Sequence, residues 1–132
     1  HVDDPARFID ARTTVTTIER DSRDPNFAVL AENRKRLARA RDAAGRPFGI
    51  VEIPMPRPVV HKGMRLPATY VNFYFVNGAL LVPTFGDRER DAAALRRLRS
   101  VVKDRRVVGV DCRALIWGLG AIHCLTQQQP RG

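Results

Sequence analysis

Long apolar runs are absent from this sequence of 132 residues. No stretch approaches the roughly 20 consecutive apolar residues that a membrane-spanning helix needs, so we expect no membrane association. The chain opens on His1-Val2-Asp3 rather than on a basic and then apolar segment, so no secretory signal peptide is visible. Because the first residue is not Met, we expect a trimmed or partial chain.

Cysteine and histidine are also scarce. The two cysteines, Cys112 and Cys124, are too few for a disulfide framework, and reduced thiols are typical of a cytoplasmic protein. A zinc site requires a tight group of about four Cys and His ligands, whereas the three histidines here are scattered. We therefore expect a cytoplasmic protein without a metal site.

Lysine is rare, yet the formal net charge is +9. Lys35, Lys62 and Lys103 are the only lysines, so most of the positive charge comes from arginine, which is concentrated in residues 34–46 and 88–106. Both segments have the pattern of helices with a charged outer face. A single-strand nucleic-acid interface would need aromatic side chains between the basic ones, and these segments have none. We expect no nucleic-acid partner and rank such binding last among the candidate functions.

The first half of the chain predicts two strands, a helix and a third strand. Residues 13–19 are mostly β-branched, as is typical of strands, and Phe27, Leu30 and Leu37 recur at helical spacing. Gly45 is placed to end that helix. The expected elements are a strand over 6–10, a strand over 13–19, a helix over 26–44 and a strand over 48–53.

The second half repeats this order after a proline-rich connection. Four of the fourteen residues in 54–67 are proline, which excludes a central strand or a helix there. Asn77-Gly78 is the strongest short hairpin signal, and Asp87 can cap a following helix. The expected elements are strands over 69–76 and 79–83, a helix over 88–102 and a strand over 106–110.

This repeated order predicts an α/β fold built from two similar units. The units cover about 6–53 and 70–110, within one domain that covers 1–132. Repeat units bury their apolar faces on their neighbours, and two units are fewer than such architectures need. The sequence therefore also indicates that part of the protein is absent.

Cys124 is the most informative residue, in the glycine-rich run from Gly118 to Pro130. A thiolate can attack an electron-poor carbon when a histidine transfers protons and a carboxylate orients the reacting groups. His1 and Asp3 supply these residue types at the other end of the chain, on the same side of the segment if it is extended. A lone cysteine is more often a small buried hydrophobic residue, and that alternative stays open from the residues alone.

Three further residues are expected to be structural. Cys112 lies beside a predicted strand end and should pack in the core. His123 precedes Cys124 directly, and neighbouring side chains diverge in extended backbone, so His123 should point away from the thiol. His61 lies in the proline-rich connection and should be solvated.

Several segments together resemble the agmatine deiminase family, the bacterial-type peptidylarginine deiminase group of the guanidino-modifying pentein superfamily. They are His1-Val2-Asp3 followed by Ala6-Arg7-Phe8, the run from Ala68 to Tyr74 with Asn77-Gly78 and Val82-Pro83, and the closing run from Gly118 to Pro130. Their order and spacing match over essentially all 132 residues. The Cys segment and the run Tyr70 to Tyr74 are specific, whereas His-x-Asp alone is weak.

The resemblance implies a five-bladed α/β propeller, of which this chain would be the C-terminal part, with about two ββαβ blades and the Cys-bearing tail. It implies that Cys124 attacks the guanidinium carbon, that His1 transfers protons and that Asp3 grips the guanidinium nitrogens. Gly118 and Gly120 would belong to the substrate-binding site. The resemblance implies no metal or organic cofactor, and it implies a homodimer for the full-length protein.

The implied reaction is hydrolysis of agmatine to N-carbamoylputrescine and ammonia through a covalent thiouronium on Cys124. Two alternatives stay open: deimination of free or peptidyl arginine, and a catalytically incomplete chain that only associates with a partner. The isolated chain is expected to be inactive alone. The run departs from the family's usual Gly-Gly-Gly-Asn at Leu119, which removes a permissive backbone position, and at Ala121, which removes a side-chain amide.

Overall fold

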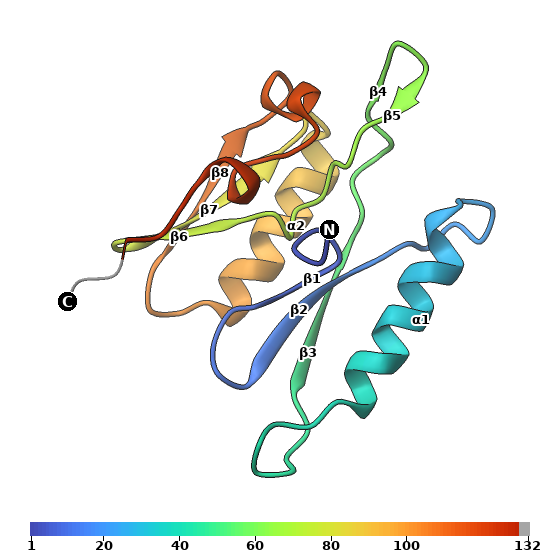
Figure 1. The fold of residues 1–132 in the computed structure, drawn as a ribbon. Coiled ribbons are helices and arrows are strands. Elements are labelled where there is room, and N and C mark those ends of the chain that lie inside the picture. Colours follow the sequence, from blue (N-terminus) through green and yellow to red (C-terminus); the bar gives the residue numbers. More distant parts are fainter. Residues whose placement is uncertain (130–132) are drawn as a thin grey trace.

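Each half of the chain forms a three-stranded sheet with one helix. The computed structural model describes residues 1–129, and residues 130–132, including Pro130 at the end of the Cys-bearing run, lie outside the described residues. In both sheets an antiparallel pair of strands is followed by a helix and a third strand parallel to the second (Figure 1). The repeat expected from the sequence is present as two ββαβ units in a mixed α/β fold.

The first unit is centred on a strand of β-branched residues. Its elements are β1 (Ala6–Phe8), β2 (Thr13–Ile18), α1 (Asn26–Arg39) and β3 (Gly49–Pro54). Residues 14–17 of β2 are all buried, as expected for a central strand that is covered on both faces. α1 packs against β2, where Asn33 Nδ2 donates to Thr16 Oγ1 at 3.2 Å.

α1 ends at Arg39, well before the predicted end at residue 44. Ala40 is already extended, and the Asp42 carboxylate accepts the backbone N–H groups of Ala44 and Arg46, both at 2.9 Å. Aspartate in such a turn competes with helical hydrogen bonding, so the predicted helix was too long. Gly45, at φ +75°, belongs to this turn and not to the helix end.

The second unit confirms the hairpin and the helix cap that the sequence predicts. Its elements are β6 (Tyr74–Val76), β7 (Ala79–Thr84), α2 (Arg88–Val101) and β8 (Arg106–Asp111). Val76 pairs with Ala79 around Gly78, which has φ +74°, and the Asp87 side chain accepts the N–H of Arg90 at 3.1 Å. Both features are local, which explains why they could be predicted.

The predicted strand over 69–76 was wrong in its first part, because only Tyr74–Val76 is a strand. Residues 68–73 are buried, but no strand pairs with them along the backbone, and several of their hydrogen bonds go to residues near the two ends of the chain. Thr69 Oγ1 donates to the carbonyl of Asp4 at 3.0 Å, and the carbonyl of Asn72 accepts the N–H of His123 at 3.2 Å. Residues 66–73 together are called the buried segment below.

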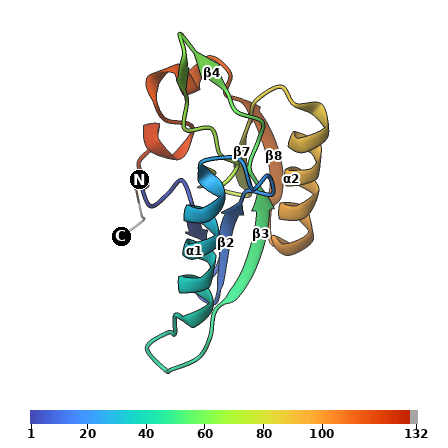
Figure 2. The same cartoon turned by 90° about the vertical axis from the view of Figure 1, so that its right-hand side faces the viewer.

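The proline-rich connection 54–67 contains only a short hairpin, β4 (Val60–His61) and β5 (Met64–Arg65). α2 contacts β8 in its own unit and β3 in the other, and thereby joins the two units (Figure 2). Within residues 1–129, no helix is long and apolar enough to cross a membrane.

Candidate active site

The turn that precedes β1 carries two neighbouring carboxylates, Asp3 and Asp4. Threonines hold this turn in place. The carbonyl of Pro5 accepts the backbone N–H of Thr17 at 2.9 Å and its hydroxyl at 3.3 Å, while Thr69 binds the Asp4 carbonyl. Because Thr17 and Thr69 are both 1% exposed, the two carboxylates start from a rigid base.

Cys124 lies in a single 3-10 turn, His123–Leu125, at the other end of the chain. Two side chains hold the segment around it. Thr126 Oγ1 donates to the carbonyl of Ile122 at 2.9 Å, and the Tyr74 hydroxyl donates to the carbonyl of Gln127 at 2.8 Å. Cys124 itself is exposed, so a reagent can reach its sulfur.

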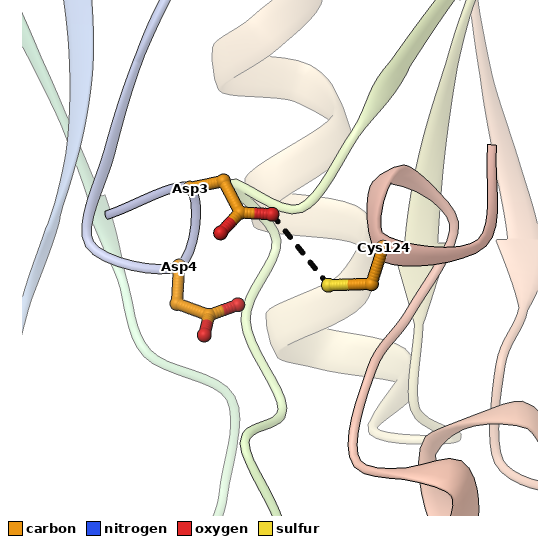
Figure 3. A group of neighbouring side chains, drawn as sticks. All are labelled: Asp3, Asp4 and Cys124. Carbon is orange, nitrogen blue, oxygen red and sulfur yellow. Dashed lines mark hydrogen bonds between the residues drawn. The ribbon is translucent and has the colours of Figure 1, made fainter. Parts of the chain in front are cut away.

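The structure brings Asp3 and Cys124 together, as the sequence predicts. Cys124 Sγ lies 3.5 Å from Asp3 Oδ2, although the two residues are 121 positions apart. Figure 3 shows the side chains of Asp3 and Asp4 facing the sulfur from the same turn. One ligand atom from each of the three residues lies within 4.8 Å of the others. Asp4 was not predicted, because only the fold shows that both adjacent carboxylates face the thiol.

Asn72, in the buried segment, connects all of these groups and was missed as a site residue. It is 0% exposed. Its Nδ2 lies 3.1 Å from Asp3 Oδ2, 3.2 Å from Asp4 Oδ1 and 3.1 Å from Cys124 Sγ. Its Oδ1 accepts the N–H groups of His123 and Cys124 at 3.0 and 3.4 Å. The available signal was a polar amide within an apolar aromatic run.

His123 does not point away from the site, contrary to the prediction. Its Nδ1 lies 2.7 Å from Asp3 Oδ2, the same oxygen that faces Cys124. The prediction assumed extended backbone, in which neighbouring side chains diverge. In the 3-10 turn observed here, His123 and Cys124 instead share one carboxylate oxygen.

His1 is not brought to the thiol. Its amino group lies 3.7 Å from Asp4 Oδ2, and His1 lines a pocket with Thr17, Leu30 and Ala68, of which Cys124 is not a lining residue. Among the hydrogen bonds of residues 1–129, none joins the His1 imidazole to Cys124 or Asp3. The predicted convergence of the two ends therefore holds for Asp3 and Cys124 but does not include this imidazole.

The two carboxylates differ in their ionisation. Burial raises the pKa of Asp3, but hydrogen bonds from His123 and Cys124 outweigh this effect and hold the pKa below its ordinary value. Burial also raises the pKa of Asp4, and the neighbouring charge of Asp3 raises it further. Asp3 is therefore the more readily ionised of the two.

Arg7 on β1 is the cation beside this cluster. Its guanidinium donates to the carbonyl of Phe73 and lies 4.8 Å from the centre of the Phe73 ring. Burial lowers the pKa of Arg7, whereas the charges of Asp3 and Cys124 raise it. Arg7 thus sets a fixed positive charge close to the thiol and its carboxylate.

The glycine-rich run contains one position where only glycine fits. A Cβ built at Gly120 would lie 2.6 Å from Cys124 Cβ and 3.1 Å from its Sγ, whereas a Cβ at Gly118 would meet nothing within 4 Å. Leu119 has φ +65°, in the left-handed region that glycine adopts most easily. Ala121 is 1% exposed and packs in the core.

Two other predicted residues can be placed. Cys112 is fully buried, as predicted, and burial raises the pKa of its thiol. His61 is not simply solvated, because its ring stacks on Trp117 with 4.2 Å between the ring centres.

Asp3, Asp4 and Cys124 are close enough to hold a metal ion. The same three residues also face Nδ2 of Asn72, which lies within 3.2 Å of one atom of each. The same groups can bind a planar cation through paired hydrogen bonds and offer a thiol to its carbon.

Comparison with known proteins points to one family. The profile of the Porphyromonas-type peptidyl-arginine deiminases matches residues 1–130. The agmatine deiminase of Stutzerimonas stutzeri is 36% identical in an alignment of 148 positions that covers 98% of this chain and 40% of that protein.

Two solved structures show the same fold. The agmatine deiminase of C. jejuni superposes with a TM-score of 0.89 at 34% identity and covers 100% of this chain and 39% of its own. That of Enterococcus faecalis superposes with a TM-score of 0.94 at 29% identity, with 99% and 40% covered. The chain spans about two fifths of the length of the curated relatives it matches.

Proposed function

This chain belongs to the Porphyromonas-type peptidyl-arginine deiminase family, and from that membership we propose that its full-length protein is a hydrolase that deiminates a guanidino group. The preferred substrate is agmatine, which would yield N-carbamoylputrescine and ammonia. The observation that carries the proposal is the 3.5 Å approach of Cys124 Sγ to Asp3 Oδ2. A thiol beside an ionised carboxylate provides both a nucleophile and a partner for a guanidinium.

In the proposed first step, the Cys124 thiolate attacks the guanidinium carbon, and a carbon–nitrogen bond breaks as ammonia leaves with an added proton. In the second step, water gives one proton to the proton-transferring histidine and attacks the thiouronium carbon; the carbon–sulfur bond then breaks, which returns the thiolate, and the second proton of the water is released to solvent. Asp3, together with Asp4, would hold the guanidinium nitrogens by charge-assisted hydrogen bonds. Gly118 and Gly120 belong to the proposed substrate-binding wall, where the close approach at Gly120 supports the assignment.

Two histidines compete for the proton-transfer role. The family resemblance assigns it to His1, whose imidazole would have to turn toward the thiol from its exposed position. His123 already binds Asp3 at 2.7 Å and is the second candidate. His1→Gln and His123→Gln in the full-length protein separate the two candidates. We expect kcat to fall by about 10²-fold or more in the variant that lacks the proton-transferring histidine, and to change by less than about tenfold in the other variant.

We also propose that the two ββαβ units are blades of a closed five-bladed propeller, and that the complete protein acts in the cytoplasm as a homodimer. The repeated topology of the two sheets supports the first statement, and the family resemblance supports the second. Sedimentation of the full-length protein measures the oligomeric state directly.

The function is tested by ammonia release from agmatine and from arginine in parallel, with full-length protein. We expect turnover of agmatine in the wild type, loss of turnover in Cys124→Ala, and retained turnover in Cys112→Ala, because the Cys112 side chain is fully buried in the core. Turnover of arginine alone would favour the arginine deiminase alternative. No turnover of either substrate by the folded protein would favour an association module.

A further inference from the structure

The side-chain amide of Asn72 faces more acceptors than it can satisfy. An amide nitrogen carries two hydrogens, but Asp3 Oδ2, Asp4 Oδ1 and Cys124 Sγ all lie within 3.2 Å of it. One of the three must share a hydrogen or go without. This shortage matters because the three acceptors do not need a donor equally in every ionisation state.

The orientation of the amide is not in question. Asn72 Oδ1 accepts two backbone N–H groups, those of His123 and Cys124. A flipped amide would set N–H groups against N–H groups at these contacts and present its oxygen to two carboxylates. The hydrogens of Nδ2 therefore face the carboxylates and the sulfur.

Ionisation of the thiol changes which acceptors need these hydrogens. A neutral thiol can donate its own hydrogen to Asp3 Oδ2 at 3.5 Å, and both amide hydrogens can then serve the carboxylates. A thiolate has no hydrogen to give and sits beside the charge of Asp3. Among the hydrogen bonds of residues 1–129, Asn72 Nδ2 is the only donor to Cys124 Sγ.

We propose that Asn72 is a positioning residue that stabilises the Cys124 thiolate, by turning an amide hydrogen from the carboxylates to the sulfur. The catalytic relevance of this role rests on the proposed function, whereas the experiment below measures the thiol directly and does not depend on that function. Four charged or titratable groups also face the sulfur: Asp3 and Asp4 from the N-terminal turn, Arg7 from β1 and His123 from the same 3-10 turn. Replacement of Asn72 keeps all four residues, but it also removes the amide hydrogen bonds to Asp3 and Asp4.

The test measures alkylation of Cys124 by iodoacetamide against pH in the full-length protein, by the mass of the Cys124 peptide. Asn72→Asp keeps an oxygen for the two backbone N–H groups and removes the N–H donors, but when ionised it also adds a negative charge beside the sulfur. Asn72→Leu removes the donors without adding a charge, so both variants are measured and both should show the same direction of change. We expect the pH of half-maximal alkylation to rise by about one to two units, so that alkylation at pH 7 slows by about 10- to 100-fold. An unchanged profile in the folded variant would overturn the proposal.

Tyr74→Phe is the matched control. It removes another anchor of the same segment, the bond to the Gln127 carbonyl, without touching the sulfur. Its alkylation profile should equal that of the wild type. A shift as large as that of Asn72→Asp would mean that general loosening, and not the amide hydrogen, controls the thiol.

A measurement on the wild type covers the case in which Asn72→Asp does not fold. The Asn72 side-chain amide resonance, followed by NMR against pH, should shift together with Cys124 alkylation and lose this shift in Cys124→Ala. Absence of the shift in the wild type also overturns the proposal. If the alkylation profiles of the wild type and the variants are as expected but the wild type releases no ammonia from agmatine or arginine, the deiminase function is refuted and the role of Asn72 is not.

Discussion

Gly120→Ala is the sharpest perturbation of the candidate site. The added Cβ would lie 2.6 Å from Cys124 Cβ and 3.1 Å from Sγ. Ordinary contacts between carbon atoms lie at about 3.5–4.0 Å, so roughly 1 Å of separation has to be gained. Because Asn72 holds the backbone N–H of Cys124, the shift cannot be absorbed without moving the thiol relative to Asp3.

The expected cost follows from this displacement. Overpacking in a well-packed interior destabilises by about 1–3 kcal/mol. Misplacing a reacting group by about 1 Å lowers the rate by about 10²-fold. We therefore expect Gly120→Ala to lower the free energy of unfolding modestly and the turnover of agmatine severely.

The assay compares ammonia release and urea unfolding for the full-length wild type, Gly120→Ala and Gly118→Ala. Gly118 is the matched control for the unfolding measurement, since its added Cβ meets nothing within 4 Å and its φ is not positive. Gly118→Ala should be neutral or stabilise by about 0.4–1 kcal/mol through the unfolded chain. Wild-type turnover in Gly120→Ala, or an equal loss of unfolding free energy in both variants, would contradict the steric argument.

Three other substitutions test the surroundings of the site by urea unfolding. Leu119→Gly relieves φ +65° at an exposed side chain and should stabilise by about 0.5–1 kcal/mol; a loss would mean that the leucine makes contacts that matter. Tyr70→Phe removes the hydroxyl that donates to buried Asp91 at 2.8 Å and should cost about 1.5–3 kcal/mol, with Cys124 alkylation unchanged. Asp4→Asn removes a carboxylate whose pKa is raised, first by burial and then by Asp3, so its ionised form opposes folding increasingly as pH rises above 3.8. It should stabilise by about 0.5 kcal/mol at pH 7 and not at pH 3, and an equal gain at both would contradict the electrostatic cause.

Local features of the fold were readable from the sequence. The β-branched run of β2, the hairpin at Asn77-Gly78 and the cap at Asp87 depend on interactions among near neighbours. The end of α1 was misjudged, because the turn closed by Asp42 outweighs the helical spacing of the apolar residues before it. The strand expected over 69–73 failed for a different reason, since these residues bond to distant segments.

The site shows the same division. The residue types, together with the family resemblance, predicted a site that contains Cys124 and Asp3, and the structure places these two side chains 3.5 Å apart. The residue types did not identify Asn72, and they assigned His123 away from the site. The positions of Asn72 and His123 both depend on the buried segment, which places the Asn72 amide between the N-terminal turn and the 3-10 turn of Cys124.

Local patterns in the sequence were enough to predict most of the helices and strands, their repeat, and a site that contains Cys124 and Asp3. The groups that surround the thiol could be found only in the folded chain. The tertiary structure placed Asp3, Asp4 and His123 there and left the His1 imidazole outside. The physical reason is that a contact between residues 121 positions apart depends on how buried polar groups such as Asn72 find their partners.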